Sequence, residues 1–180
     1  MSRVIVLLRA VNVGGRNKLP MAELRAALED VGFENVSSYI QSGNLVIDPG
    51  GLDEARVEHD VAAVIADRFG LAVAVIARTP EELERVIARH PFAAPGLPPE
   101  MLHVCFLERA PAAERVASLD VERLLPDRCR VDGREVYLHY PNGSGRSKLT
   151  GAYLERQLGG IPATARNLTT IRKLVELTVG

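Results

Sequence analysis

The spacing of apolar residues along this chain predicts an order of strands and helices that is almost repeated in its second half. Short continuous apolar runs, which are typical of buried strands, alternate with apolar residues at the spacing of a helix face. Over residues 1–78 the order is strand, helix, strand, strand, helix, strand, and its first five elements recur after residue 98. This is the element order of the ferredoxin-like unit. We therefore expect an α+β protein of duplicated ferredoxin-like (βαββαβ) units with mainly antiparallel sheets and an extra C-terminal helix.

Local start and stop signals place the individual elements. Pro20 stands at an expected first helical position, and Gly32 and Gly70 follow the ends of apolar helical patterns. The expected strands are 3–10, 38–41, 44–47, 71–77, 102–107, 128–131 and 135–140. The expected helices are 21–31, 53–69, 79–89, 112–119, 148–158 and 168–177. The last of these helices stands where the second half would need its sixth element, a strand.

Prolines mark the boundary between the two halves. Residues 90–100 contain four prolines and form the only composition break long enough for a linker. We expect a first ferredoxin-like half at 1–78, a helix and proline-rich linker at 79–97, and a second half with the terminal helix at 98–180. Each half alone is small for an independent core, so we expect the two sheets to lie side by side or edge to edge.

Composition points to an ordinary folded protein. A chain of 180 residues with 47% hydrophobic side chains can bury a substantial core without cross-links. Its two cysteines, Cys105 and Cys129, are 24 residues apart and form no Cys-x-x-Cys pair. The five apolar residues between Arg3 and Arg9 are too few for a secretory or membrane-spanning segment, and no other segment fits one. We expect a cytoplasmic protein with two free, buried thiols and no membrane partner.

The charges are unevenly distributed along the chain. The net charge of −1 and the isoelectric point near 6.4 argue against a general nucleic-acid binder. Residues 1–22 carry four basic and no acidic side chains, residues 136–180 carry six basic and two acidic ones, and the segment between them has a net charge of −9. With 19 Arg and 3 Lys in the chain, solvated charges on helix faces are the alternative explanation.

Three polar loops in these basic ends run into expected helix starts, at 12–18, 142–148 and 166–167. They combine glycine, which lets a backbone approach a ligand, with cations and the unpaired N–H groups of a helix N-terminus. These are the parts of an anion site. The candidate ligand-binding residues, including those of the hairpin turn around Ser42, are Arg9, Asn12, Gly14, Gly15, Arg16, Asn17, Lys18, Gln41, Ser42, Asn44, Tyr140, Asn142, Gly145, Arg146, Ser147, Lys148, Arg166 and Asn167.

The 143–148 loop differs from a phosphate-binding P-loop. That motif needs glycine before its lysine and a hydroxyl directly after it, whereas Lys148 is preceded by Ser147 and followed by Leu149. The glycine pair at 14–15 likewise lacks the spacing of a dinucleotide-binding loop. Two interpretations of the 143–148 loop stay open: a nest of backbone amides assisted by its two cations, or a plain helix-entry turn with Ser147 as N-cap.

No catalytic or metal site can be read from the sequence. The four histidines, at 59, 90, 103 and 139, have no metal-ligand spacing, so we expect no metal and no cofactor. His139 lies beside a candidate loop, where a hydrogen-bonded structural role is a simpler interpretation than a catalytic base. The serines of the glycine loops have no histidine and acid in a readable order. Aromatic residues, at 4%, offer few rings for stacking on bases.

The polar loops also carry a family resemblance. The stretches concerned are 8–21, 32–36, 39–44, 139–150 and 164–167. They read LRAVNVGGRNKLPM, GFENV, YIQSGN, HYPNGSGRSKLT and TARN, and with them the chain resembles the bacterial domain-of-unknown-function family 1697. The resemblance implies a compact α+β protein related to ferredoxin-like folds, with no established activity, whose signature residues are these polar loop residues. The family pattern implies an aromatic residue after Asn167 where this chain has Leu168, which weakens a stacking role there.

Three classes of function are compatible with these features. The leading hypothesis is a binding protein for an anionic ligand, either a phosphate-bearing small molecule, a nucleotide or a short stretch of nucleic acid. The second is an enzyme of phosphoryl or nucleotide chemistry, which needs an acid, a base or a metal site close to the basic loops. The third is a protein-interaction or self-association module that uses a sheet edge or an apolar helix face, with the loops as structure only. The oligomeric state is open.

Overall fold

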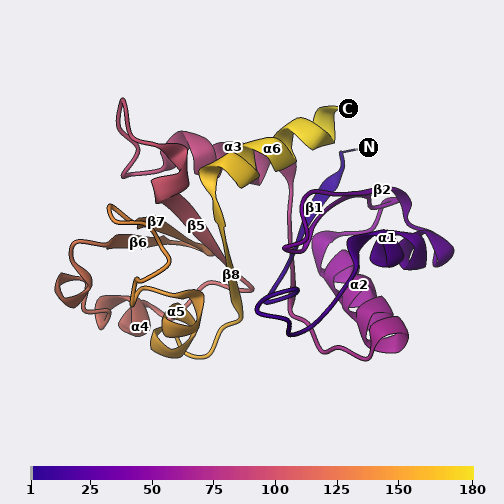
Figure 1. Ribbon diagram of the computed structural model, residues 1–180, viewed down its shortest axis with the longest axis horizontal. Coiled ribbons are helices and arrows are strands. Elements are labelled where there is room, and N and C mark those ends of the chain that lie inside the picture. The colour runs from indigo at the N-terminus through magenta and orange to yellow at the C-terminus, as the bar shows by residue number, and fades with distance from the viewer. Residues whose placement is uncertain (1) are drawn as a thin grey trace. The chain divides into compact units, whose positions relative to one another are not determined.

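The computed structural model describes residues 2–180 and has a mixed α+β fold (Figure 1). Its described part contains two four-stranded antiparallel sheets and six α-helices, so the predicted α+β class is confirmed. The chain divides into two compact units. Unit 1 comprises the residues up to Glu84 together with Lys173–Gly180, and unit 2 comprises Arg85–Arg172.

The sheet of unit 1 has the strand order β2-β3-β1-β4. Its elements are β1 (Val4–Leu8), α1 (Met21–Asp30), β2 (Glu34–Ser38), β3 (Asn44–Asp48), α2 (Glu54–Phe69) and β4 (Val75–Arg78). The central strand β1 is paired on both sides and all its residues are buried. Side chains alternate across a strand, so Val4, Val6 and Leu8 share one face, and they form one core with apolar residues of α1 and α2. Both helices therefore cover that face.

The sheet of unit 2 has the strand order β6-β7-β5-β8. Its elements are the single-turn helix η1 (Pro99–Met101), β5 (Leu102–Leu107), α4 (Ala113–Ala117), the single-turn helix η2 (Glu122–Leu124), β6 (Arg128–Asp132), β7 (Glu135–His139), α5 (Gly151–Gln157) and β8 (Ala163–Asn167). Its core includes Cys105 and Leu107 of β5, Val136 and Leu138 of β7, and Leu154 of α5. Both cysteines carry free thiols, Cys105 fully buried and Cys129 half-buried.

The two boundaries between unit 1 and unit 2 fall within helices. These helices are α3 (Pro80–Arg89) and α6 (Leu168–Val179). The first is held by a reciprocal capping box, in which the Glu82 backbone N–H donates to the Thr79 hydroxyl over 3.2 Å and the Thr79 N–H donates to the Glu82 carboxylate over 3.0 Å. None of the described helices is long and apolar enough to cross a membrane.

The structure corrects one predicted strand and adds one that the sequence did not predict. The strand expected at 38–41 is wrong, because β2 is Glu34–Ser38 and residues 39–43 form a loop. This edge strand is polar and irregular in register between Glu34 and Ser37, so it shows no apolar alternation. The sixth element of the second half is also a strand, β8, which pairs with β5 before α6 begins at Leu168. Its small and polar residues, Ala-Thr-Ala-Arg-Asn, give no strand signal, and pairing with β5 imposes the conformation.

Candidate functional site

Two loops of unit 1, residues 9–18 after β1 and residues 39–43 after β2, are joined by hydrogen bonds; we call them the paired loops. The Asn12 side-chain amide donates to the carbonyl of Gln41 over 2.6 Å and to the carbonyl of Leu19 over 2.8 Å. Its oxygen accepts from the Leu19 N–H over 2.8 Å. The structure thus brings together two segments that the sequence pattern could only nominate separately.

The other amide side chains of the paired loops also bond within the protein. Asn17 donates to the carbonyl of Ala10 over 3.0 Å, and the Gln41 side-chain oxygen accepts from the backbone N–H of Met21, the first residue of α1, over 3.4 Å. Asn44 is buried at the start of β3 and donates to the Tyr39 carbonyl and the Ser42 hydroxyl. These side chains brace the loops.

Several residues of the paired loops lie in the left-handed region of backbone conformation. Asn12 and Asn17 have φ of 54° and 50°, which asparagine tolerates, but Ala10 at 54° and Ile40 at 52° have no such preference. A β-branched residue such as Ile40 rarely adopts this conformation. No sequence signal predicts it, because neither residue type marks a turn. The bracing hydrogen bonds therefore hold a strained backbone in place.

Gly43 allows the second loop to lie against the first. Its φ is +84°, and a Cβ at this position would lie 2.6 Å from Cγ2 of Val11 and 2.7 Å from Cβ of Leu8. Its carbonyl accepts from the Leu8 N–H over 2.8 Å. No other residue type fits this position without displacing the buried side chains of β1 and the loop that follows it.

The cations at the tip of the first loop face solvent. Arg16 and Lys18 are exposed, and within residues 2–180 neither side chain forms a hydrogen bond or an ion pair. Gly14 and Gly15 beside them are exposed, with φ of 57° and 74°. Arg9, at the base of the loop, is half-buried, and its N–H donates to the carbonyl of Ala74. The two cations and the two glycines at the tip of this loop are thus open to solvent.

Hydrogen bonds also hold the loop at residues 142–148 of unit 2, which we call the glycine loop. Ser147 donates to a carboxylate oxygen of Asp127 over 2.5 Å and accepts from the N–H of Leu149 over 2.9 Å. The buried Tyr140 hydroxyl donates to the Leu149 carbonyl over 2.7 Å. The candidate residues of this loop that are exposed are Asn142, Gly145, Arg146 and Lys148.

The helix expected at 148–158 begins later. Helix α5 starts at Gly151, and its N-cap is Thr150, whose hydroxyl accepts from the N–H of Tyr153 over 3.1 Å. Ser147 is therefore not the N-cap, because its hydroxyl is engaged by Asp127 and Leu149. Arg146 and Lys148 lie before the N-cap and outside the first turn of α5. The expected junction, in which these cations stand directly at the first N–H groups of a helix, is therefore not formed.

Arg166 and Asn167 end strand β8 in unit 2. Arg166 is 8% exposed, and its guanidinium donates to the Thr164 hydroxyl over 2.6 Å and the Ala165 carbonyl over 2.8 Å. Burial lowers the pKa of Arg166 to about 10, although Cys105 acts to raise it, so the guanidinium stays charged at neutral pH. Asn167 caps α6 by accepting from the N–H of Thr170 over 2.8 Å.

A family model described as "Protein of unknown function (DUF1697)" matches residues 1–137 of the chain. The chain belongs to this family. The matched range contains the paired loops and ends before the glycine loop of unit 2, so the paired loops are the part of the candidate site that lies within the DUF1697 match.

A solved structure shares the fold over nearly the full length of the chain. It is described as a conserved bacterial protein, SP0830, from Streptococcus pneumoniae, and it aligns with a TM-score of 0.65 and 24% sequence identity over 98% of each chain. No curated protein matches the sequence.

A cluster of histidine and aromatic rings in unit 2 of this DUF1697 protein has no counterpart in the sequence analysis. His90 is buried, donates from Nε2 to the carbonyl of His103 over 3.0 Å, and packs edge-on against Tyr137. Phe92 stacks on His139, with the Arg128 guanidinium 4.5 Å above the Phe92 ring. These residues come from four separate segments, so no spacing reveals the cluster.

His90 and His103 are held neutral by their surroundings. Burial, together with the neighbouring His90, lowers the pKa of His103 to about 4. Burial also lowers the pKa of His90. Within residues 2–180 no three histidine, cysteine, aspartate or glutamate side chains are grouped so that they could hold a metal ion.

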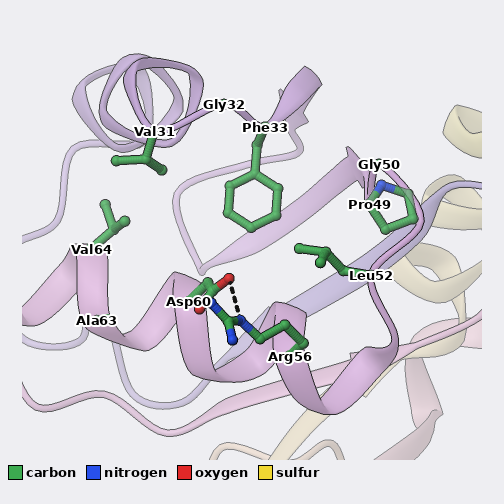
Figure 2. A pocket seen from close by; sticks show the side chains of 10 residues that line it. All are labelled: Val31, Gly32, Phe33, Pro49, Gly50, Leu52, Arg56, Asp60, Ala63 and Val64. Carbon is green, nitrogen blue, oxygen red and sulfur yellow. Dashed lines mark hydrogen bonds and ion pairs between the residues drawn. The ribbon is translucent and has the colours of Figure 1, made fainter.

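Unit 1 also contains an apolar hollow of about 480 Å³ between the end of α1, the β3–α2 connection and α2. Figure 2 shows Phe33 and Leu52 pointing into it above Arg56 and Asp60 of α2, which form an ion pair of 2.8 Å. Val31 and Leu52 on its wall are 52% and 40% exposed. Such exposure of large apolar side chains marks a surface that can bury them against another molecule.

Proposed function

We propose that this protein binds an anionic ligand, a phosphate-bearing metabolite, a nucleotide or a short stretch of nucleic acid, at the paired loops. Arg16 and Lys18 supply the charge, and the exposed backbone of Gly14 and Gly15 lets the anion approach closely. One observation carries the proposal: amide side chains hold a strained loop pair while the cations at its tip have no partner within residues 2–180.

Backbone strain of this kind is informative because it costs free energy. A non-glycine residue in the left-handed region costs about 1–3 kcal/mol, and it persists only where the surroundings impose it. Ala10 and Ile40 lie on the two loops that Asn12 joins, so the strain is concentrated in one place. A loop fixed before the ligand arrives loses little conformational entropy on binding, which favours affinity.

The glycine loop of unit 2 is the secondary contributor. Arg146 and Lys148 add two exposed cations, but the Asp127 carboxylate bound to Ser147 brings negative charge to the same loop. Arg166 is buried and bonded to Thr164 and Ala165 of β8, so its guanidinium is not at the surface where a ligand would bind. For these reasons we assign Arg16 and Lys18 the principal role.

The experiment compares anion-dependent stabilisation in three proteins. Inorganic phosphate, AMP and glucose 6-phosphate are added at low salt, and the melting temperature is recorded by calorimetry. The parent protein and the control R156A/R172A, which loses two exposed arginines of α5 and α6, should both show an upward shift. The R16A/K18A variant should melt at the parent temperature without ligand and show a clearly smaller shift than the parent and the control. Equal shifts in all three proteins, or none in the parent, contradict the proposal.

A self-association module is the second candidate function, and the apolar hollow of unit 1 favours it. Burial of Val31 and Leu52 against a second copy of the chain removes apolar surface from water. Light scattering over a range of protein concentrations should then show assembly in the parent and in the control L125D, whose exposed leucine lies in unit 2, but not in V31D. A monomeric parent at all concentrations rejects this candidate.

We also propose that the chain is a duplication of one ferredoxin-like unit and that the protein is cytoplasmic. The halves are 1–78 and 98–180, joined by the helix and proline-rich linker at 79–97. The corresponding strand orders β2-β3-β1-β4 and β6-β7-β5-β8 support the duplication, because each places the first and third strands of its half at the centre. An experimental structure in which the four strands of one half superpose on those of the other would test it.

A further inference from the structure

Strand β6 forms one edge of the sheet in unit 2 and presents two arginines on one face. Register pairs Arg130 with Tyr137 and Arg128 with His139 of β7. Directly opposed residues of antiparallel strands point to the same face and lie side by side. The alternate residues of β6, Cys129 and Val131, pack against the core on the other face. Arg128 and Arg130 therefore belong to the face opposite that core, and both are exposed.

A third arginine comes to this face from the end of α3. Arg89 is the last residue of the helix, and His90 directly after it is buried against the sheet. The His90 ring contacts the Tyr137 ring at 5.1 Å between centroids and bonds to the carbonyl of His103 over 3.0 Å. This anchor fixes the chain beside Tyr137 and so fixes where Arg89 lies.

Arg89, Arg130 and Tyr137 line one pocket of about 280 Å³, together with Pro91, Val131 and Asp132. Within residues 2–180 neither arginine forms an ion pair with a carboxylate. Burial raises the pKa of the Tyr137 hydroxyl, as do the carboxylates of Asp132 and Glu135, while Arg89 and Arg85 act to lower it. Two unpaired cations and a protonated phenol therefore converge on a small polar pocket.

We propose that this pocket of unit 2 binds the phosphate group of a small phosphate monoester, with Arg89 and Arg130 as charge partners and the Tyr137 hydroxyl as hydrogen-bond donor. Guanidinium groups are suited to this role because their planar N–H groups match phosphate oxygens in pairs. The pocket has room for a phosphate and a few further atoms, which excludes a polymer as the group inside it.

The carboxylate of Asp132 on the pocket wall sets the ligand's orientation. It repels phosphate oxygens, so the anion lies on the side of Arg89 and Arg130, and the carboxylate is left to accept a hydrogen bond from a hydroxyl of the ester. The proposal thus favours a hydroxylated ester over a bare anion. It concerns a site in unit 2 that is independent of the paired loops of unit 1.

The test is calorimetric titration of the full chain at low salt with inorganic phosphate and with glycerol 3-phosphate. We expect both to bind the parent, glycerol 3-phosphate the more tightly. R89Q and R130Q should each weaken binding about tenfold or more. Y137F should weaken it to a smaller extent, because it removes one hydrogen bond from a neutral donor, whereas each arginine substitution also removes a full positive charge. R115Q and R123Q, which change exposed arginines of unit 2 outside the pocket, are the matched controls.

Each outcome decides the proposal. Unchanged binding in both R89Q and R130Q overturns it, and so does equal weakening in the R115Q and R123Q controls, which would indicate general electrostatic attraction. R16A/K18A should retain binding at this pocket, so the failure of either anion site is distinguishable from that of the other. Circular dichroism of each variant confirms folding, and because Arg89 and Arg130 lie on different elements, misfolding of one variant leaves the other as the test.

Discussion

Replacing Gly43 with alanine should destabilise unit 1 through the contact between the paired loops. The new Cβ would lie 2.6 Å from Cγ2 of Val11 and 2.7 Å from Cβ of Leu8, and both neighbours are buried. Overpacking of this kind costs about 1–3 kcal/mol, and a Cβ in the left-handed conformation costs about 1–2 kcal/mol more. The free energy of unfolding should therefore fall by about 2–5 kcal/mol.

The matched control for this substitution is G15A. Gly15 has a similar φ of +74°, but a Cβ there meets nothing within 4 Å, so only the conformational cost of about 1–2 kcal/mol applies. Urea unfolding followed by circular dichroism measures both variants, and the difference between them isolates the close contact. If G43A loses no more stability than G15A, the loops do not lie as close together as the structure has them, and the argument for a rigid loop pair fails.

Three further predictions concern single sites. N12A should lower the free energy of unfolding by about 2–3 kcal/mol, because it leaves the N–H and carbonyl of Leu19 without their partner. N12D should lose at least as much, because it places a carboxylate oxygen against the carbonyl oxygens of Leu19 and Gln41 in place of the amide donor. Urea unfolding measures both, and a neutral N12A would contradict the bracing role. The pKa of His103 is depressed to about 4 in the folded protein, so the stability that the neutral ring contributes is fully present above the unfolded pKa near 6.5 and is lost as the pH falls from there to 4. H103Q should reduce the loss of unfolding free energy over this pH range by about 1–2 kcal/mol. An unchanged dependence of stability on pH would contradict the assignment. R146A/K148A should keep the parent melting temperature in ligand-free buffer, because exposed charges contribute about 0–1 kcal/mol, whereas unfolding of this variant would show that the two side chains brace the loop.

Much of the fold could be predicted because its central strands have a distinct pattern. The apolar run Leu102–Leu107 was expected as a strand and is β5 with the same limits, since a strand paired on both sides must be apolar. Strand β8 could not be predicted, because Ala163–Asn167 is small and polar and its pairing with β5 is a tertiary effect. The start of α5 depends on whether Ser147 or Thr150 caps the helix. Thr150 is the cap, because the Ser147 hydroxyl is bonded to Asp127, which is distant in sequence.

The candidate loops were recognisable from composition, but the roles of their residues were not. Asn12 and Lys18 are both polar residues of one loop, yet Asn12 bonds to the backbone and Lys18 faces solvent. Only the hydrogen bonds in the structure distinguish these two roles. The left-handed Ala10 and Ile40 carry no signal because their residue types do not favour that conformation. The pocket of Arg89, Arg130 and Tyr137 draws on three segments that only the folded sheet brings together.

The central claim is that the tip of the paired loops binds an anion, and backbone amide resonances test it most directly. In a titration of the isotope-labelled chain with inorganic phosphate, the amide signals of Gly14, Gly15 and Arg16 should shift in a saturable manner. The Gly14 and Gly15 signals should not move in R16A/K18A, while those of Arg130 and Tyr137 should report the separate pocket of unit 2. Signals at 14–16 that stay in place up to saturation of the unit 2 pocket, or that drift without saturating as all exposed amides do, would contradict the claim.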